Sequence, residues 1–144
     1  MNTYKRLIFT AIVPALFAIV SCSNENKDLS AFNDKTDKIT VEYYKEDGAT
    51  VIKGFQVVAD TASEIVSMMG YFTNNEIDAS TDCDKNGLIH FYQGENEIFT
   101  AEISIEGECS VYYYTVNDKN KSKAISETGK AYFSKYFETA ASLN

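Results

Sequence analysis

The 144-residue sequence contains no tryptophan, a single histidine and a single arginine, Arg6. The shortage of arginine disfavours two large classes of function. Nucleic-acid binding depends on neutralising phosphates with basic side chains, and this chain has 21 acidic against 13 basic residues. Bidentate capture of carboxylates or phosphates by guanidinium groups is disfavoured for the same reason. We therefore expect no nucleic-acid partner.

Motifs of the common enzyme classes are also missing from the sequence. It has no G-x-S-x-G, no H-E-x-x-H and no phosphate-binding glycine loop. The lone His90 shares a strand-like face with Leu88 and Tyr92, where a packed or half-exposed position is the simplest interpretation. A hydrolase with a carboxylate pair stays open as an alternative, because 21 acidic residues make some pair inevitable and no spacing singles one out.

The N-terminus has the organisation of an export signal. Lys5 and Arg6 form a short basic start, and they are followed by an apolar run at 7–20, LIFTAIVPALFAIV. This run is too short to span a bilayer comfortably as a helix. A cleaved signal is therefore favoured over an uncleaved anchor.

Residues 19–22, Ile-Val-Ser-Cys, resemble the lipobox of bacterial lipoproteins. The resemblance covers about the first 28 residues. It implies that residues 1–21 are removed and that Cys22 becomes the first mature residue, with palmitate or a similar fatty acid on its sulfur and amino group. The acidic stretch 24–28 is loosely similar to surface-export signals in lipoproteins of Bacteroidota. We expect an outer-membrane lipoprotein of the bacterial cell envelope, facing the periplasm or the surface; an ordinary secretory peptide cut nearby is the alternative.

The lipid is expected to provide the membrane attachment by itself. Each buried methylene contributes about 0.8 kcal/mol, so two or three acyl chains make attachment effectively permanent. Removal of the signal leaves 11 basic against 21 acidic residues, a balance that anionic lipid repels. Residues 22–36 are polar and lack apolar periodicity, so they are expected to form a flexible tether. Residues 37–144 then form a single domain with one modest core.

Two cysteines remain once Cys22 is lipidated. The cell envelope permits disulfides, so we expect Cys83 and Cys109 to form one, and two free buried thiols are the alternative. Closing a loop of that length stabilises a fold by roughly 3–4 kcal/mol on the chain-entropy model.

Alternation and capping patterns predict an α+β domain, in which an antiparallel sheet of six to seven strands carries two helices on one face. The predicted order is ββαβββββα, or one strand fewer. A capping box at 61–64 starts the first helix, and Ser126 caps the last. Strands are expected at 39–44, 51–58, 76–83, 88–93, 99–105, 109–116 and 124–125.

The stretch 82–89, DCDKNGLI, matches the opening of a calcium loop. Its closing position falls on Gln93, a poor ligand, and its flanks alternate with period two where an EF-hand needs helices. Asn-Gly is also the preferred two-residue hairpin turn, so a turn is the favoured interpretation. A weak calcium site using Asp82, Asp84 and Asn86 stays open as an alternative, and no other cofactor is expected.

The chain is rich in tyrosine, with ten residues. Ring directions must alternate along the strand 112–114 and again at 43–44, so some rings face away from the core. Exposed tyrosines are enriched in interfaces. We therefore predict a macromolecular binding, inhibitor or accessory module with a protein partner, using Tyr44, Tyr112 and Tyr114. The alternative is that outward tyrosines only stabilise cross-strand pairs.

The lipidation hypothesis can be tested on protein purified from membranes. Mass spectrometry is expected to find Cys22 as the first residue, carrying fatty acid. An intact leader, or a trimmed product without fatty acid, would contradict it.

Overall fold

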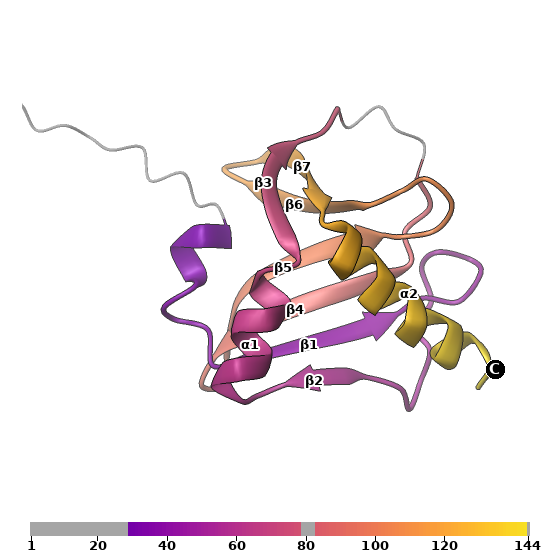
Figure 1. Cartoon of the computed structure of the whole chain (residues 1–144), viewed down its shortest axis with the longest axis horizontal. Helices are drawn as coiled ribbons and strands as arrows, with labels where there is room; N and C mark the ends of the chain where they lie inside the picture. The colour runs from indigo at the N-terminus through magenta and orange to yellow at the C-terminus, as the bar shows by residue number, and fades with distance from the viewer. Residues whose placement is uncertain (1–28, 79–82, 144) are drawn as a thin grey trace, which may run out of the picture.

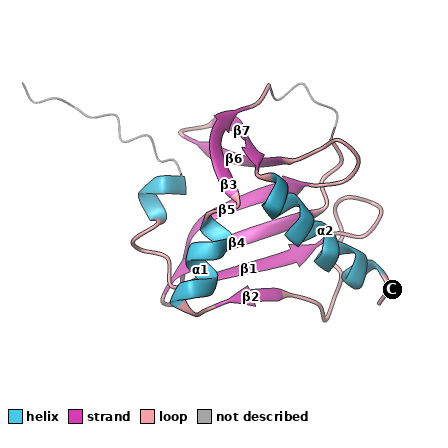
Figure 2. Cartoon of the chain, viewed as in Figure 1, coloured by secondary structure: helices cyan, strands magenta, loops and turns pink. Residues whose placement is uncertain are grey.

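A computed structural model of the chain describes residues 29–78 and 83–143. In this part of the chain a seven-stranded antiparallel sheet carries two α-helices on one face, which confirms the predicted α+β class (Figures 1 and 2). The strand order across the sheet is β2-β1-β4-β5-β6-β7-β3. The face toward the helices is called the inner face below, and the opposite one the outer face.

The elements follow one another in the predicted order along the chain. A short 3-10 helix, η1, comprises Leu29–Phe32, and the α-helices are α1 (Ala62–Met69) and α2 (Glu127–Ala141). None of the helices in the described ranges is long and apolar enough to cross a bilayer. The strands are β1 (Lys38–Tyr43), β2 (Val57–Ala59), β3 (Phe72–Glu76), β4 (Gly87–Gln93), β5 (Asn96–Ser104), β6 (Val111–Val116) and β7 (Lys119–Ile125).

Both α-helices begin where their capping residues predict. The Thr61 hydroxyl accepts the backbone N–H of Glu64, and the Glu64 carboxylate accepts the backbone N–H of Thr61, which completes the capping box. The Ser126 side chain accepts the backbone N–H of Gly129 at the start of α2. These local hydrogen bonds satisfy donors that the first helical turn leaves without partners.

The core lies between the two helices and the inner face of the sheet. Alternate residues of the central strands point inward, as period-two patterning requires. Aromatic rings make up much of this layer, and Phe72 of β3 contacts Phe91, Tyr112 and Phe133 at centroid distances of 5.1–5.9 Å. The sheet therefore curls enough for its edge strand β3 to reach the centre of the core.

The expected tether is shorter than predicted at its C-terminal end. Leu29 is buried in the core, and the Phe32 ring lies 5.3 Å from the ring of Phe99 on β5. Two apolar side chains in an otherwise polar stretch are enough to attach η1 to the domain. Residues 22–28 and the signal 1–21 lie outside the described residues.

Two strand predictions were wrong. Between 51 and 58 only Val57–Ala59 forms a strand, together with an isolated bridge between Tyr44 and Val51, because the chain turns at Gly54 with φ +83°. The strand expected from residue 76 onward is instead found at Phe72–Glu76, and it pairs with β7 at the opposite side of the sheet. Residues 79–82 of the expected strand lie outside the described residues.

Asn86 and Gly87 do not form the predicted hairpin turn. Gly87 opens β4 and lies opposite Tyr43 of β1. A Cβ atom on Gly87 would lie 2.5 Å from the backbone oxygen of Glu42, closer than carbon and oxygen can approach. Glycine is required here by the close approach of two strands and not by a turn.

The predicted disulfide is confirmed. Cys83 and Cys109 are bonded with their Cα atoms 5.9 Å apart. The bridge joins the segment before β4 to the segment before β6, at a sequence separation of 26. It therefore holds the start of β6 close to the residues of β5 with which β6 pairs.

Substitution of Gly87 by alanine is expected to lower the free energy of unfolding by about 2–3 kcal/mol, because β1 and β4 must separate to admit the methyl group. Urea denaturation of purified protein measures this. The matched control is Gly94→Ala, at a turn where φ is +62° and no atom lies within 4 Å of the added Cβ. Its cost is about 1 kcal/mol, from backbone strain alone. Equal losses in the two variants would contradict the close-approach argument.

Candidate groove between two central strands

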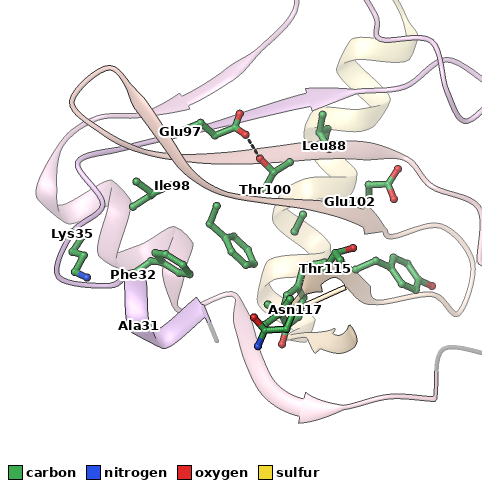
Figure 3. Close-up of a pocket in the computed structure, with 15 residues that line it drawn as sticks. Ala31, Phe32, Lys35, Leu88, Glu97, Ile98, Thr100, Glu102, Thr115 and Asn117 are labelled. Atoms are coloured by element: carbon green, nitrogen blue, oxygen red, sulfur yellow. Dashed lines mark hydrogen bonds between the residues drawn. The ribbon is translucent and has the colours of Figure 1, made fainter. Parts of the chain in front are cut away.

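A hollow of the described surface lies where β5 and β6 separate. The two strands pair only at Glu102–Tyr113, Ile103–Tyr112 and Ser104–Val111. β5 nevertheless extends back to Asn96 and β6 extends forward to Val116. The strands diverge beyond the paired residues and leave a groove of about 760 Å³ (Figure 3). This volume falls in the range of small-ligand sites.

The groove has an apolar base and a polar rim. Figure 3 shows Lys35 and Phe32 at one end and Glu102 at the other, with the Glu97–Thr100 hydrogen bond on the β5 side. The apolar lining comprises Ala31, Phe32, Leu88, Ile98, Phe99, Ala101, Tyr114 and Val116. The polar lining comprises Lys35, Glu97, Thr100, Glu102, Tyr113, Thr115 and Asn117.

Local backbone features shape the two walls. A register shift between Phe91 and Tyr92 leaves Ile98 as an extra residue in β5, and such bulges bend a strand and increase its twist. On the other wall, Asn117 and Asp118 adopt positive φ of 51° and 60° in the tight turn between β6 and β7. Asparagine and aspartate tolerate this conformation better than most residues. The turn places Asn117 at the rim.

The 3-10 helix η1 closes one end of the groove. Its Phe32 ring packs on Phe99, whose own ring lies 5.4 Å from that of Tyr114 across the gap between β5 and β6. The two strands therefore remain in contact through side chains where their backbone pairing has ended. Packed aromatic rings bound the groove at this end.

His90 lies beside the groove and contacts two carboxylates. Its Nδ1 atom is 2.6 Å from Glu97 Oε2, and its Nε2 atom is 3.8 Å from Glu42 Oε2. The Thr100 hydroxyl donates to Glu97 Oε1 at 2.6 Å. The Thr100 hydrogen bond is the main cause of the lowered pKa of Glu97, and the contact with His90 adds to it. Glu97 is therefore ionised at neutral pH.

Three carboxylates share the outer face next to the groove. Glu102 is ion-paired with Lys85, and Glu42 lies in the same cross-strand row as Glu102, with Leu88 between them. Glu97 lies in the row of Tyr92 and Lys38, and the Lys38 ammonium group lies 4.4 Å from the centroid of the Tyr92 ring. Within the described ranges, two buried hydroxyls of this face, those of Thr40 and Tyr113, make no hydrogen bond.

The carboxylate-site alternative gains no support from this geometry. A glycosidase needs one carboxylic acid with a raised pKa beside an ionised partner. In the groove, Glu97 has a lowered pKa and Glu102 is paired with an ammonium group. Glu97 is therefore held in its charged form and is not the proton donor that such a site needs.

The predicted binding tyrosines are not at the surface. Tyr44, Tyr112 and Tyr114 are 7%, 1% and 7% exposed. Tyr112 lies opposite the buried Ile103, and its hydroxyl donates to the backbone oxygen of Thr73 at 2.8 Å. The exposure expected for these three rings is not found, because alternation shows that neighbouring rings diverge but not which of them faces inward. Tyr114 nevertheless lines the groove. The outward ring of the triplet is Tyr113, which lines the groove.

Asn86, proposed as a calcium ligand, is buried and has a structural role. Its Oδ1 atom accepts the backbone N–H of Ile105 at 2.8 Å, and its Nδ2 atom donates to Glu106 at 2.6 Å. The backbone oxygen of Asp84 accepts the Ser104 hydroxyl. Asp82 lies outside the described residues, as does Cys22. Among the described residues no three acidic, histidine or cysteine side chains are arranged to hold a metal ion.

Sequence reasoning missed Glu97, Thr100 and Glu102 as groove residues. The available signal was weak, since the three differ from other polar strand residues only in lying along β5. Their shared position depends on where β6 leaves β5, and no local pattern encodes that point.

Comparisons with known proteins give no match to this chain among family models, curated proteins or solved structures. The functional argument therefore depends on the residues and their geometry. These define an α+β domain with a mixed polar and apolar groove at a split in its sheet.

Proposed function

We propose that the chain is a lipid-anchored protein of the bacterial cell envelope, and that its domain is a binding module that holds a protein partner at the groove between β5 and β6. The anchor follows from the lipobox-like sequence at 19–22. The domain contributes recognition of the partner.

The observation that carries the binding role is the split between β5 and β6. It combines an apolar base, a polar rim and a volume of about 760 Å³ on a part of the sheet that neither α-helix covers (Figures 1 and 3). Sites that bind ligands have this combination, in which apolar area supplies affinity and a few polar groups fix orientation. The outward ring of Tyr113 adds a residue type that is enriched in interfaces.

The disulfide supports the proposed cell-envelope location as well as the fold. A bond between Cys83 and Cys109 is expected in an oxidising compartment and is rare in the reducing cytosol of most bacteria. A cell-envelope location supplies that environment. The disulfide and the N-terminal signal therefore point to the same side of the inner membrane.

Site-specific photo-crosslinking in intact cells tests the binding role. A benzophenone amino acid at Thr115 or Lys35, which lie on different walls of the groove, is expected to give the same crosslinked partner. The matched control is Val66, which is 72% exposed on α1 of the other face, and it is expected to give no such product. The absence of a product at both groove positions, or the same product from Val66, would contradict the proposal.

A further inference from the structure

We propose that the groove binds the C-terminal end of a partner protein, as an extended segment that pairs with the edge of β5 and places its terminal carboxylate at Lys35. This inference rests on the proposed binding role and specifies which part of the partner is bound. It follows from four features: an edge of β5 without a strand partner, the closure of the groove by η1, the antiparallel direction of the sheet, and a lysine at the closed end.

The first feature is the edge of β5 that faces the groove. β5 pairs with β4 along Asn96–Ile103, whereas only residues 102–104 pair with β6 on the other side. Within the described part of the chain no strand pairs with residues 96–101 at this edge, and no backbone hydrogen bond joins η1 to it. An added extended chain can pair the backbone N–H and C=O groups of such an edge. The edge therefore favours a peptide segment as the occupant.

The second feature is the closure of the groove at the end where β5 begins. The Phe32 ring of η1 packs on Phe99 at 5.3 Å, and Ala31 and Lys35 belong to the lining at this end (Figure 3). At the other end the strands converge on a paired region that neither α-helix covers on the outer face, so a bound chain can leave there. A chain that meets η1 has to stop or turn. The closed end therefore favours a chain terminus.

The third feature is the direction in which strands of this sheet pair. All pairs of the described strands are antiparallel. β5 begins with Asn96 near η1 and runs toward Ser104 at the paired end. A segment that adds antiparallel to β5 therefore runs toward η1 and brings its C-terminus there. A parallel segment would bring an N-terminal ammonium group to the same place.

The fourth feature distinguishes between these two directions. Lys35 is exposed and lies at the η1 end of the groove (Figure 3). Among the described residues no carboxylate lies within ion-pairing distance of its ammonium group. The nearby carboxylate of Glu97 contacts His90 and Thr100 instead. The Lys35 ammonium group attracts a C-terminal carboxylate and repels an N-terminal ammonium group, so it selects the antiparallel direction.

The base of the groove adds a preference for apolar side chains. Phe99 and Tyr114 line the groove, with their ring centroids 5.4 Å apart. Side chains of an extended segment alternate, so one set lies on these rings and the other set faces the outer side. The expected occupant therefore ends in a free carboxylate and carries apolar residues at alternate positions.

Fluorescence anisotropy with synthetic peptides tests the inference on the full protein purified from membranes in detergent. The probe is a hexapeptide of alternating serine and valine, with a fluorescent label on its N-terminus and a free C-terminal carboxylate. The same peptide with a C-terminal amide is expected to bind about fivefold more weakly, because it lacks the charge that Lys35 attracts. The carboxylate peptide with methylated backbone nitrogens is expected to bind at least about tenfold more weakly, since it cannot donate the strand hydrogen bonds.

Substitutions of Lys35 test whether its charge produces the preference. Lys35→Gln is expected to bind the carboxylate and amide peptides equally well, and Lys35→Glu is expected to prefer the amide, because the sign of the charge is reversed. The matched control is Lys53→Gln, at another exposed lysine, in the segment before β2. It should keep the preference of about fivefold for the carboxylate peptide.

The inference is overturned if the carboxylate peptide fails to bind at millimolar concentration, if the amide or the methylated peptide binds equally well, or if Lys35→Gln keeps the preference for the carboxylate. These failures differ from failure of the proposed function, for which the crosslink from Thr115 is the reference, because that variant keeps Lys35. A Thr115 crosslink in cells without a carboxylate preference would overturn this inference and keep the binding role. A carboxylate preference without any groove crosslink would support the chemistry inferred for the groove and contradict the role in cells.

Discussion

Three residue pairs hold β5 and β6 together, and the two strands separate beyond these pairs. This separation creates the groove on which the binding proposal depends. A continuous ladder would have used every backbone group of β5 and left a closed sheet. The early end of the ladder instead produces a groove whose base is made of side chains and whose wall is a strand edge. Everything proposed about binding depends on this local failure of pairing.

Several constraints fix where the ladder ends. The Cys83–Cys109 bond and the buried amide of Asn86 hold the paired end of β5 and β6, because they connect the segments around residues 83–86 and 105–109. At the other end, the Ile98 bulge and η1 keep the strands apart while aromatic contacts close the base. The split is therefore supported from both ends by specific contacts, and it does not depend on the turn at Asn117 alone.

The sequence predicts features that local chemistry determines and fails where distant contacts decide. Thr61 and Ser126 start the helices as expected, because capping involves only the next few residues. The prediction of a turn at Asn86–Gly87 was wrong, because the glycine is needed for close packing against the backbone of Glu42 and not for a turn. The expected exposure of Tyr112 was wrong, because its inward direction is set by its neighbour Ile103 on another strand. The groove residues depend on the same long-range pairing.

Hydrogen exchange at the backbone amides of β5 tests the central claim most directly. In a strand paired on one side only, alternate amides lack a strand partner, whereas pairing on both sides protects successive amides. The account predicts that residues 97–101 contain amides that exchange much faster than those of residues 102–104 in the unliganded protein. Uniformly slow exchange along the whole of β5 would contradict it, because no strand edge would then face the groove.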